Sequence, residues 1–332
     1  MNNATIKDIA KELNISTATV SRVLNNSGYA SDEVKKKVLE TAKRLNYRPN
    51  AIARSLKKHQ TNTIGIIVPD ISNPFFMKVS RGIEDIVHKN GYHLIFASAD
   101  ENPKKEREML QVLYEKRVDA LVLATSGENE DYIKKIKSAG IPIILVDRKI
   151  NNETLGLDYV VEDNIQGAYE LTRYIIKHGH TRIGVVNGSL TVSTGWERFE
   201  GCKMALKENG IDLNSAYTFN GDFTKEGGFK AADYFLNLPE VPTSILSFNN
   251  TMTFGILLRL SQNGMSNYKN LIIASYGENE ADQLIKIPKI ISIKQSPYEM
   301  GLRTGEILLK RLLNNVEAPI FETITPALNS PV

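Results

Sequence analysis

The sequence is poor in cysteine and in long apolar runs. Cys202 is the single cysteine among 332 residues, so no intrachain disulfide can form, and a reducing, cytoplasmic compartment is indicated. The N-terminus has no signal-peptide core, and no apolar segment approaches the length that spans a bilayer. With 42% hydrophobic and 24% charged residues, the chain reads as a globular protein with room for two or three cores.

The motifs of enzymes and metal sites are also missing. There is no Gly-rich phosphate loop, no nucleophile elbow and no pair of carboxylates at helical spacing within an apolar segment. His178 and His180 are metal-ligand types, but a helix C-terminus explains them better, because Gly179 suits a positive φ there. Cys202 lies in an amphipathic helix and is interpreted as a core residue. We therefore expect no catalytic residue, no metal and no cofactor.

What the sequence does contain, close to its N-terminus, is two short amphipathic helices joined by a three-residue turn. Apolar residues recur at helical spacing over residues 6–13, with Thr5 placed to cap the first turn, and Ser16 is placed to cap a second helix over residues 17–25. This pattern predicts a helix-turn-helix. The face of the second helix that points away from the core carries Thr17, Ala18, Ser21, Arg22 and Asn25.

That face suits recognition of DNA bases. Small side chains permit close approach to the major groove, and arginine can bind guanine N7 and O6. The alternative is a small helical bundle whose polar face is merely solvated. Ser31 caps a third helix through Leu45, and residues 1–60 hold twelve Lys and Arg against five Asp and Glu, a net charge of +7. The remainder holds twenty-nine against thirty-three, or −4, so a basic head suited to a polyphosphate partner precedes a mildly acidic body.

A linker with its own pattern follows the head. Pro49 stops the third helix, and Asn50 could cap a helix of only two turns over residues 51–57. So short a helix is marginal in water. Our hypothesis is that it orders on DNA, with Leu56 as a wedge between base steps and Ala53 permitting close approach in the minor groove. A basic linker that stays disordered is the alternative.

Residues 5–10, 16–25 and 46–56 resemble the head and hinge of the lactose-repressor (LacI/GalR) family of bacterial transcription regulators. The resemblance implies a sequence-specific DNA-binding repressor of carbohydrate-utilisation genes, controlled by a sugar or sugar phosphate. It implies that Thr17, Ala18 and Arg22 read bases and that Leu56 wedges the centre of a pseudo-palindromic operator. The other positions expected to contact or position the DNA are Thr5, Ser16, Thr19, Ser21, Asn25, Tyr47, Asn50 and Ala53.

Beyond the linker, short apolar runs alternate with amphipathic helical stretches. Strands are expected at residues 63–69, 93–98, 120–124, 142–146, 182–186, 217–219, 244–248, 271–274, 290–293 and 321–324. The alternation predicts an all-α head followed by an α/β body of two doubly wound subdomains, of the periplasmic-binding-protein type that the resemblance implies. The expected boundaries are a head at 1–48, a hinge at 49–60 and a body at 61–332, divided into 61–160 with 291–320 and 161–290 with 321–332.

Ligands of open α/β sheets bind beyond the carboxyl ends of the strands. Asp70 and Asn249 are among the side chains expected there, and they suit the hydroxyl groups of a sugar, although either could be a loop cap instead. Arg198 is the strongest single candidate implied by the resemblance; its alternative is a surface pair with Glu197 or Glu200. The resemblance further implies that Phe75 and Phe76 form an aromatic pair under the effector and that Phe223 forms an aromatic wall. It also implies effector contacts from the acid Asp147 and from Gln295, a glutamine at the crossover between the subdomains.

The chain departs from the family pattern at two carboxylate positions. Gly277 and Asn250 stand where the family usually has aspartate. A sugar that needs carboxylate acceptors would have to use Asp147 or Glu278, so the effector is left open by the sequence.

Two rival classes share the α/β body. A periplasmic carbohydrate-binding protein would need a signal peptide and no basic head, and a sugar-modifying enzyme would need the missing motifs. Because paired heads on a symmetric site gain effective concentration, we expect a homodimer joined through the body. The sequence after residue 324 has no leucine heptads, which favours a dimer over a tetramer.

Overall fold

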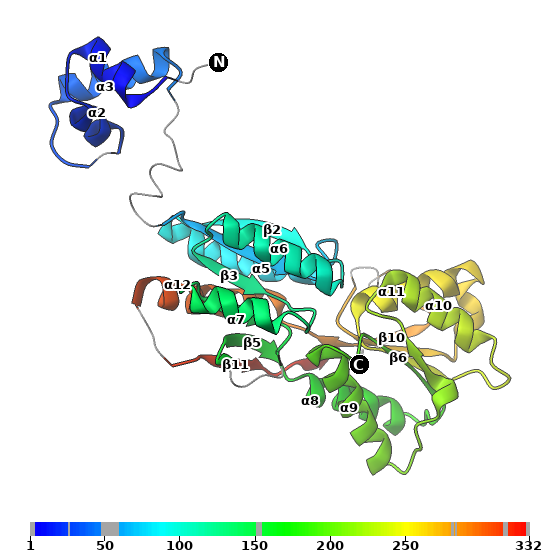
Figure 1. The fold of residues 1–332 in the computed structure, drawn as a ribbon. Coiled ribbons are helices and arrows are strands. Elements are labelled where there is room, and N and C mark those ends of the chain that lie inside the picture. The colour runs from blue at the N-terminus through cyan, green and yellow to red at the C-terminus, as the bar shows by residue number, and fades with distance from the viewer. Residues whose placement is uncertain are drawn as a thin grey trace. The chain divides into compact units, whose positions relative to one another are not determined.

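The computed structural model describes residues 4–25, 27–47, 60–150, 155–279, 282, 284–314 and 318–329. The chain divides into two compact units, Met1–Thr61 and Asn62–Val332, which are described separately (Figure 1). Among the described residues, no helix has both the length and the apolar character needed to cross a bilayer.

The first unit contains the three predicted helices, α1 (Ile6–Leu13), α2 (Thr17–Leu24) and α3 (Asp32–Arg44). Asn14 ends α1 with a φ of 51°, which turns the chain towards α2. The helices close on a small core of Ile9, Ala10, Val20, Val38 and Ala42. The predicted helix-turn-helix is confirmed.

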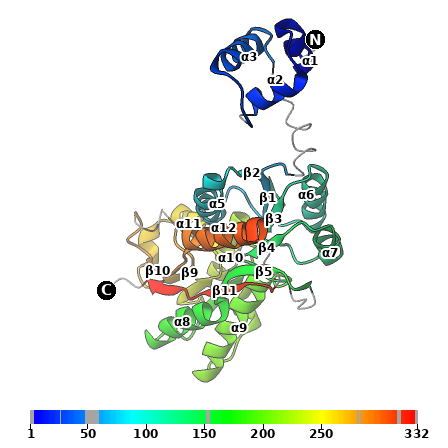
Figure 2. The same cartoon turned by 90° about the vertical axis from the view of Figure 1, so that its left-hand side faces the viewer.

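The second unit consists of two lobes, each built on a six-stranded sheet (Figures 1 and 2). Lobe 1 contains β1 (Thr63–Val68), β2 (His93–Ser98), β3 (Ala120–Leu123), β4 (Ile143–Val146), β5 (Asp158–Glu162), β11 (Phe321–Ile324), α5 (Pro74–Val87), η1 (His88–Asn90), α6 (Pro103–Glu115), α7 (Glu130–Ser138) and α12 (Pro297–Asn314). Its strand order is β11-β5-β4-β3-β1-β2, and every pairing is parallel.

Lobe 2 contains β6 (Ile183–Asn187), β7 (Thr218–Asn220), β8 (Ser244–Ser247), β9 (Ile272–Tyr276), β10 (Lys289–Lys294), β12 (Ala327–Asn329), α8 (Asn164–Lys177), α9 (Ser193–Glu208), η3 (Ser215–Tyr217), α10 (Lys225–Leu236), α11 (Asn250–Gln262) and η4 (Met265–Tyr268). Its order is β12-β10-β9-β8-β6-β7, parallel except where β12 pairs antiparallel with β10. In both lobes the order reverses at the first strand, β1 or β6, which places a binding crevice at the carboxyl ends of these strands.

Helices cover both faces of each sheet, so the central strands are apolar along their whole length. In lobe 1, α5 packs beside α12 on one face (Figure 2), and a separate core cluster lies under α6 and α7. In lobe 2, the paired helices α8 with α9 and α10 with α11 bury one continuous cluster that includes Phe235, Phe248 and Cys202. The interpretation of Cys202 as a core residue is confirmed: it is fully buried, and burial raises the pKa of its thiol to about 12.

Two segments were assigned to the wrong subdomain. Residues 291–294 belong to β10, which pairs with β9 in lobe 2, whereas residues 321–324 form β11, which pairs with β5 in lobe 1. The reason is that α12 packs on lobe 1, so the strand that follows it joins the same sheet, and the Phe321 ring stacks on Tyr159 at 4.7 Å. The lobes are therefore connected at residues 163, 295–296 and 325–326.

Two strands were not predicted. β5 is bounded by acids, Asp158 and Glu162, and both are buried: Asp158 accepts from Arg311, and Glu162 accepts from Gln295. β12 is a three-residue edge strand too short to show alternation. The helices α9 and α11, which contribute residues to the site, begin at Ser193 and Asn250.

Candidate functional site

The polar face of α2 is presented to solvent as predicted. Ser16 caps the helix by accepting a hydrogen bond from the Thr19 backbone N–H at 3.1 Å. Val20 is buried in the head core, which leaves Thr17, Ala18 and Arg22 exposed. These side chains are therefore free of the head core and accessible to a partner.

The other head residues predicted to contact DNA differ in their hydrogen bonding and burial. Thr5 is the N-cap residue of α1, and both its backbone N–H and its hydroxyl donate to the Asp8 carboxylate at 2.7 Å. Asn25 donates to the Ser21 carbonyl at 2.8 Å, and Tyr47 is half-buried against the head core. The hinge candidates Asn50, Ala53 and Leu56 lie outside the described residues. One exposed aromatic was missed by the sequence reasoning, Tyr29, which is 90% exposed after α2.

A small cavity of about 30 Å³, here named the inner cavity, lies between the two lobes. The structure brings all eight predicted effector residues to its wall: Asp70, Phe75, Phe76, Asp147, Arg198, Phe223, Asn249 and Gln295. The remaining lining residues, not on that list, are Asn73, Glu101, Arg148, Thr194, Asn250 and Tyr276. Its volume holds only about two water molecules, so a larger ligand requires the lobes to separate.

Arg198 projects from α9 into this cavity and is only 5% exposed. Its Nε donates to Asn164 Oδ1 and its Nη1 to the Phe248 carbonyl, both at 2.8 Å, and its guanidinium stacks over the Tyr276 ring. The alternative of a surface ion pair is wrong, because Glu197 pairs with Lys149 and Glu200 with Lys203. Arg198 Nη2 faces Asp147 at 3.9 Å.

Asp147 ends β4 with a φ of 64° and lies between two guanidinium groups. It is 7% exposed, and burial raises the pKa of its carboxyl despite the opposing charges of Arg198 and Arg148. Arg148 donates to both oxygens of Glu101, at 2.7 and 2.6 Å, and its guanidinium lies over the Phe223 ring at 5.0 Å. Arg148 was missed by the sequence reasoning; its adjacency to Asp147 at the end of a buried strand was the available signal.

The aromatic candidates form opposite walls of the cavity. Phe75 and Phe76, at the start of α5 in lobe 1, are buried and meet edge to face with centroids 5.2 Å apart. Phe223, in lobe 2, is also buried, with a φ of 60°. Aromatic faces on both lobes suit the apolar face of a ring-shaped ligand.

Two predicted ligand contacts have local roles as well. The Asp70 carboxylate accepts from the backbone and hydroxyl of Ser72, at 2.8 and 2.6 Å. Asn249 caps α11 by accepting from the Met252 N–H at 2.7 Å. The loop-cap alternative is therefore realised at both positions, although both also line the inner cavity.

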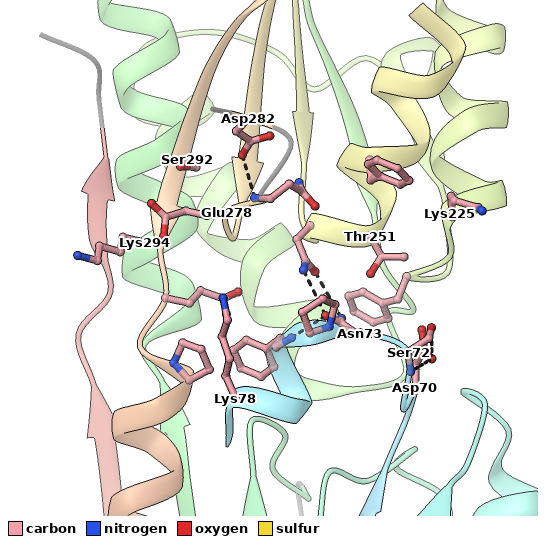
Figure 3. A pocket seen from close by; sticks show the side chains of 18 of the residues that line it. Asp70, Ser72, Asn73, Lys78, Lys225, Thr251, Glu278, Asp282, Ser292 and Lys294 are labelled. Atoms are coloured by element: carbon pink, nitrogen blue, oxygen red, sulfur yellow. Dashed lines mark hydrogen bonds between the residues drawn. The ribbon is translucent and has the colours of Figure 1, made fainter. Parts of the chain in front are cut away.

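Asn250, one of the two positions expected to depart from the family pattern, bridges the lobes. Its side-chain amide and that of Asn73 bond reciprocally at 3.2 and 3.4 Å, as the dashed lines at Asn73 in Figure 3 mark. On another side of the cleft, Lys149 contacts lobe 2 through its backbone N–H to Ser193 Oγ at 2.8 Å. These contacts, together with the ion pair of Lys149 and Glu197 at 2.7 Å, join the two lobes beside the inner cavity.

Gly277, the second departure, lies at the end of β9 with a φ of 101°, and a Cβ there would stand 2.6 Å from Gln295 Oε1. Gln295 occupies the space where a longer side chain at residue 277 would lie, and it donates to Glu162 at 2.8 Å. Burial raises the pKa of Glu162 to about 6, although the bond from Gln295 opposes this rise. This contact ties the crossover at residues 295–296 to the end of β5.

Replacing Gly277 by alanine should lower the free energy of unfolding of the body by roughly 1 to 2 kcal/mol, because the backbone conformation is strained for an L-residue and Gln295 must move. Chemical denaturation measures this loss. Gly255→Ala is unsuitable as a control, because a Cβ at Gly255 would collide with the backbone of Lys225. Ala139→Ser, at the exposed end of α7, is the better control and should leave the free energy of unfolding nearly unchanged.

A second, larger hollow of about 1480 Å³, here named the outer groove, adjoins the inner cavity. The lining residues common to both are Asp70, Asn73, Phe75, Glu101, Phe223, Asn250 and Gln295. Figure 3 shows it between the start of α5, the start of α11 and β10, with Lys78, Lys225 and Lys294 at its rim. Glu278, the alternative acceptor, lines this groove and not the inner cavity, and it accepts from Asn329 at 2.8 Å.

The His178-Gly179-His180 segment follows the end of α8. Gly179 has a φ of 86°, as expected of a helix C-terminus. The ring of His178 bonds the Tyr174 carbonyl at 2.8 Å, and that of His180 bonds Thr243 Oγ1 at 3.0 Å. Throughout the part of the chain that the structure describes, no three His, Cys, Asp or Glu side chains gather as metal ligands would.

A helix-turn-helix head and a two-lobed body with a polar and aromatic cavity between the lobes define a DNA-binding transcriptional regulator controlled by a small molecule. Residues 5–50 match the family described as "Bacterial regulatory proteins, lacI family", and residues 61–284 match "Periplasmic binding proteins and sugar binding domain of LacI family". The chain belongs to the LacI family of bacterial regulatory proteins.

Individual relatives agree with this assignment. The HTH-type transcriptional repressor PurR of Aliivibrio salmonicida is 33% identical, over 96% of each chain. A LacI-family regulator from Enterococcus faecium, solved with bound ribose, is 29% identical with a TM-score of 0.72, over 81% of this chain and 97% of that chain. The lac repressor dimer bound to operator, 21% identical over 98% of each chain, has the same fold with a TM-score of 0.81. The chain is thus a regulator and not an enzyme.

Proposed function

We propose that the chain represses genes of carbohydrate use and that its effector, a sugar or sugar phosphate, binds in the inner cavity. The observation that carries the proposal is that Arg198, Asp147 and three aromatic rings, contributed by both lobes, line one cavity. Guanidinium and carboxylate groups bond hydroxyls, and aromatic faces pack on sugar rings. The bound ribose of the Enterococcus faecium relative supports the same ligand class.

The head at residues 1–48 provides the DNA contacts in this proposal. Thr17, Ala18 and Arg22 read bases in the major groove, because α2 presents them to solvent at its exposed face. The flanking groups that position the phosphate backbone are Thr5, Ser16, Thr19, Ser21, Asn25, Tyr47 and Asn50. The hinge at residues 49–60 inserts Leu56 at the centre of the operator, with Ala53 against the minor groove.

We propose further that the protein is a cytoplasmic homodimer whose interface lies on the body at residues 61–332. The edge strand β2 exposes Ile95 and Phe96, each 39% accessible, and an apolar strand edge favours pairing with a second copy. Two copies would place two heads on a symmetric operator. An effector that contacts both lobes alters their closure and so the spacing of the two hinges.

Selection of bound fragments from random or genomic DNA by the purified chain tests the proposal, followed by titration of the selected duplex with sugars. We expect one pseudo-palindromic sequence to be enriched and at least one carbohydrate to change its affinity. Retention of no sequence over bulk competitor at physiological salt would favour a carbohydrate-binding protein without operator function.

Changing Leu56 to alanine should weaken operator binding and leave effector binding intact, since the proposed wedge acts only on DNA. Operator affinity is measured by fluorescence anisotropy and effector affinity by calorimetry on the same preparation. Equal loss of both affinities would place the role of Leu56 in the body instead of the hinge.

A further inference from the structure

The inner cavity carries no excess positive charge. Its ionisable lining consists of three carboxylates, Asp70, Glu101 and Asp147, and two guanidinium groups, Arg148 and Arg198. With all five groups ionised the net charge is −1. A phosphate or carboxylate group entering this narrow space would add to a charge of its own sign.

Both arginines already have anionic or dipolar partners. Arg148 is 3% exposed and bonds Glu101 through two nitrogens, at 2.7 and 2.6 Å. Burial alone would lower its pKa, but the charge and hydrogen bonds of Glu101 raise it. Arg198 bonds two neutral oxygens and faces Asp147. Each guanidinium charge therefore already has a carboxylate beside it, Glu101 or Asp147, although Arg148 Nε itself has no hydrogen-bond partner.

The behaviour of Asp147 indicates how the site treats a negative charge. Two arginines flank this carboxylate, yet burial outweighs them and raises its pKa. Glu101 and Glu197 act in the same direction. A second buried anion would meet the same loss of hydration and additional repulsion.

The outer groove does not supply a buried positive charge for an anionic ligand either. Its five lysines, Lys78, Lys225, Lys286, Lys289 and Lys294, are all exposed. Six carboxylates line the same groove, and two of them, Asp70 and Glu101, are shared with the inner cavity. The two linings together hold seven carboxylates and seven cationic side chains, so the groove brings the total charge to zero and provides no positive excess. Exposed lysines remain hydrated and contribute little to holding a buried anion.

We propose that the effector is an uncharged polyhydroxylated molecule, a sugar or polyol that carries neither phosphate nor carboxylate. This inference rests on the proposed function of the inner cavity as the effector site. Hydroxyl groups both donate and accept, so one ligand can satisfy the Asp147 carboxylate and the guanidinium N–H groups together. Three buried polar atoms on residues that line the cavity, Arg148 Nε and the hydroxyls of Thr194 and Tyr276, have no hydrogen-bond partner and suit such a ligand as well.

Matched pairs of ligands test this directly on the full chain: ribose with ribose 5-phosphate, fructose with fructose 1-phosphate, glucose with glucose 6-phosphate, and galactose with galactose 1-phosphate. Calorimetry gives each affinity. Trp196, the single tryptophan, is 49% exposed on α9 two residues before Arg198, so its emission gives a second readout. In at least one pair we expect the neutral sugar to bind, with its phosphorylated partner at least about tenfold weaker.

Changing Glu101 to glutamine supplies the charge test. The substitution preserves side-chain size, raises the net charge of the cavity by one and leaves Arg148 unmatched. The preference for the neutral member should fall by about tenfold. Asp131→Asn makes the same charge change at an exposed pair with Arg107 that lines neither hollow, and it should leave the preference unchanged. If the Glu101 variant fails to fold, Asp70→Asn makes the same change elsewhere in the lining.

The outcomes distinguish the inference of an uncharged effector from the proposed function as a carbohydrate-controlled regulator. A neutral sugar preferred in the parent and a smaller preference in Glu101→Gln support the inference. Equal or tighter binding of a phosphorylated member overturns the inference and leaves a carbohydrate effector in place. Binding of no member of any pair overturns the inference together with the proposed carbohydrate function, while DNA selection still tests the head.

Discussion

Replacing Arg198 by methionine should abolish the response to ligand and lower the free energy of unfolding of the body by about 3 to 5 kcal/mol. The guanidinium is buried, donates to Asn164 and to the Phe248 carbonyl, and lies 3.9 Å from Asp147. Its removal leaves a buried carboxylate with one cation fewer and two buried acceptors without their donor. Urea unfolding followed by circular dichroism measures the stability, and effector titration of the operator complex measures the response.

Two further variants separate the buried network from a general effect of losing an arginine. Arg81→Met removes a guanidinium whose side chain is 65% exposed and paired with Glu84 and Asp85, and it should cost no more than about 1 kcal/mol. Combining Arg198→Met with Asp147→Asn should cost less than the two changes added, because the unmatched carboxylate is then gone. Full retention of ligand response in Arg198→Met would remove this residue from the effector site.

Local sequence pattern was sufficient for most of the fold. The helix-turn-helix followed from apolar spacing and from Ser16, which does cap α2. Strands such as β1 and β3 are continuous apolar runs because both sheet faces are covered by helices. In these elements the short-range signal and the tertiary environment agree.

Where the prediction was wrong, the deciding contacts are distant in sequence. β5 was not predicted because two acids, Asp158 and Glu162, stand at its ends. They are tolerated there because Arg311 of α12 and Gln295 of the preceding turn bond them, from more than 130 positions away. The sheet that accepts β10 or β11 depends on which lobe α12 packs against. Alternation of strands and helices counts these elements but does not assign them to a sheet.

The candidate site shows the same division. Strand ends and the family resemblance together named eight residues that the structure gathers around one cavity, and their contact with an effector stays a prediction. Arg148 was missed because its partner Glu101 lies 47 positions away on another strand's loop. The reciprocal amide pair of Asn73 and Asn250, 177 positions apart, could not be read locally either.

Arg22→Ala should weaken specific operator binding by about 1 to 3 kcal/mol and relax the preference at one base position. Arg22 is exposed on α2, whose opposite face is fixed by Val20 in the head core, so the substitution removes a groove contact without disturbing the fold. Affinities for the selected operator and for every single-base variant of it, measured at one salt concentration, give the profile. The loss should be concentrated at one position of each half-site, where all four bases become nearly equivalent.

Lys37→Ala is the matched control because it removes the same charge from the head. Lys37 lies on α3, where it pairs with Glu33 at 2.8 Å, and it is exposed. Loss of a charge acting only on phosphates weakens binding to all sequences alike and reduces its salt dependence, but leaves the base profile unchanged. A profile for Arg22→Ala that matches that of Lys37→Ala would assign Arg22 to the DNA backbone and leave base reading to Thr17 and Ala18.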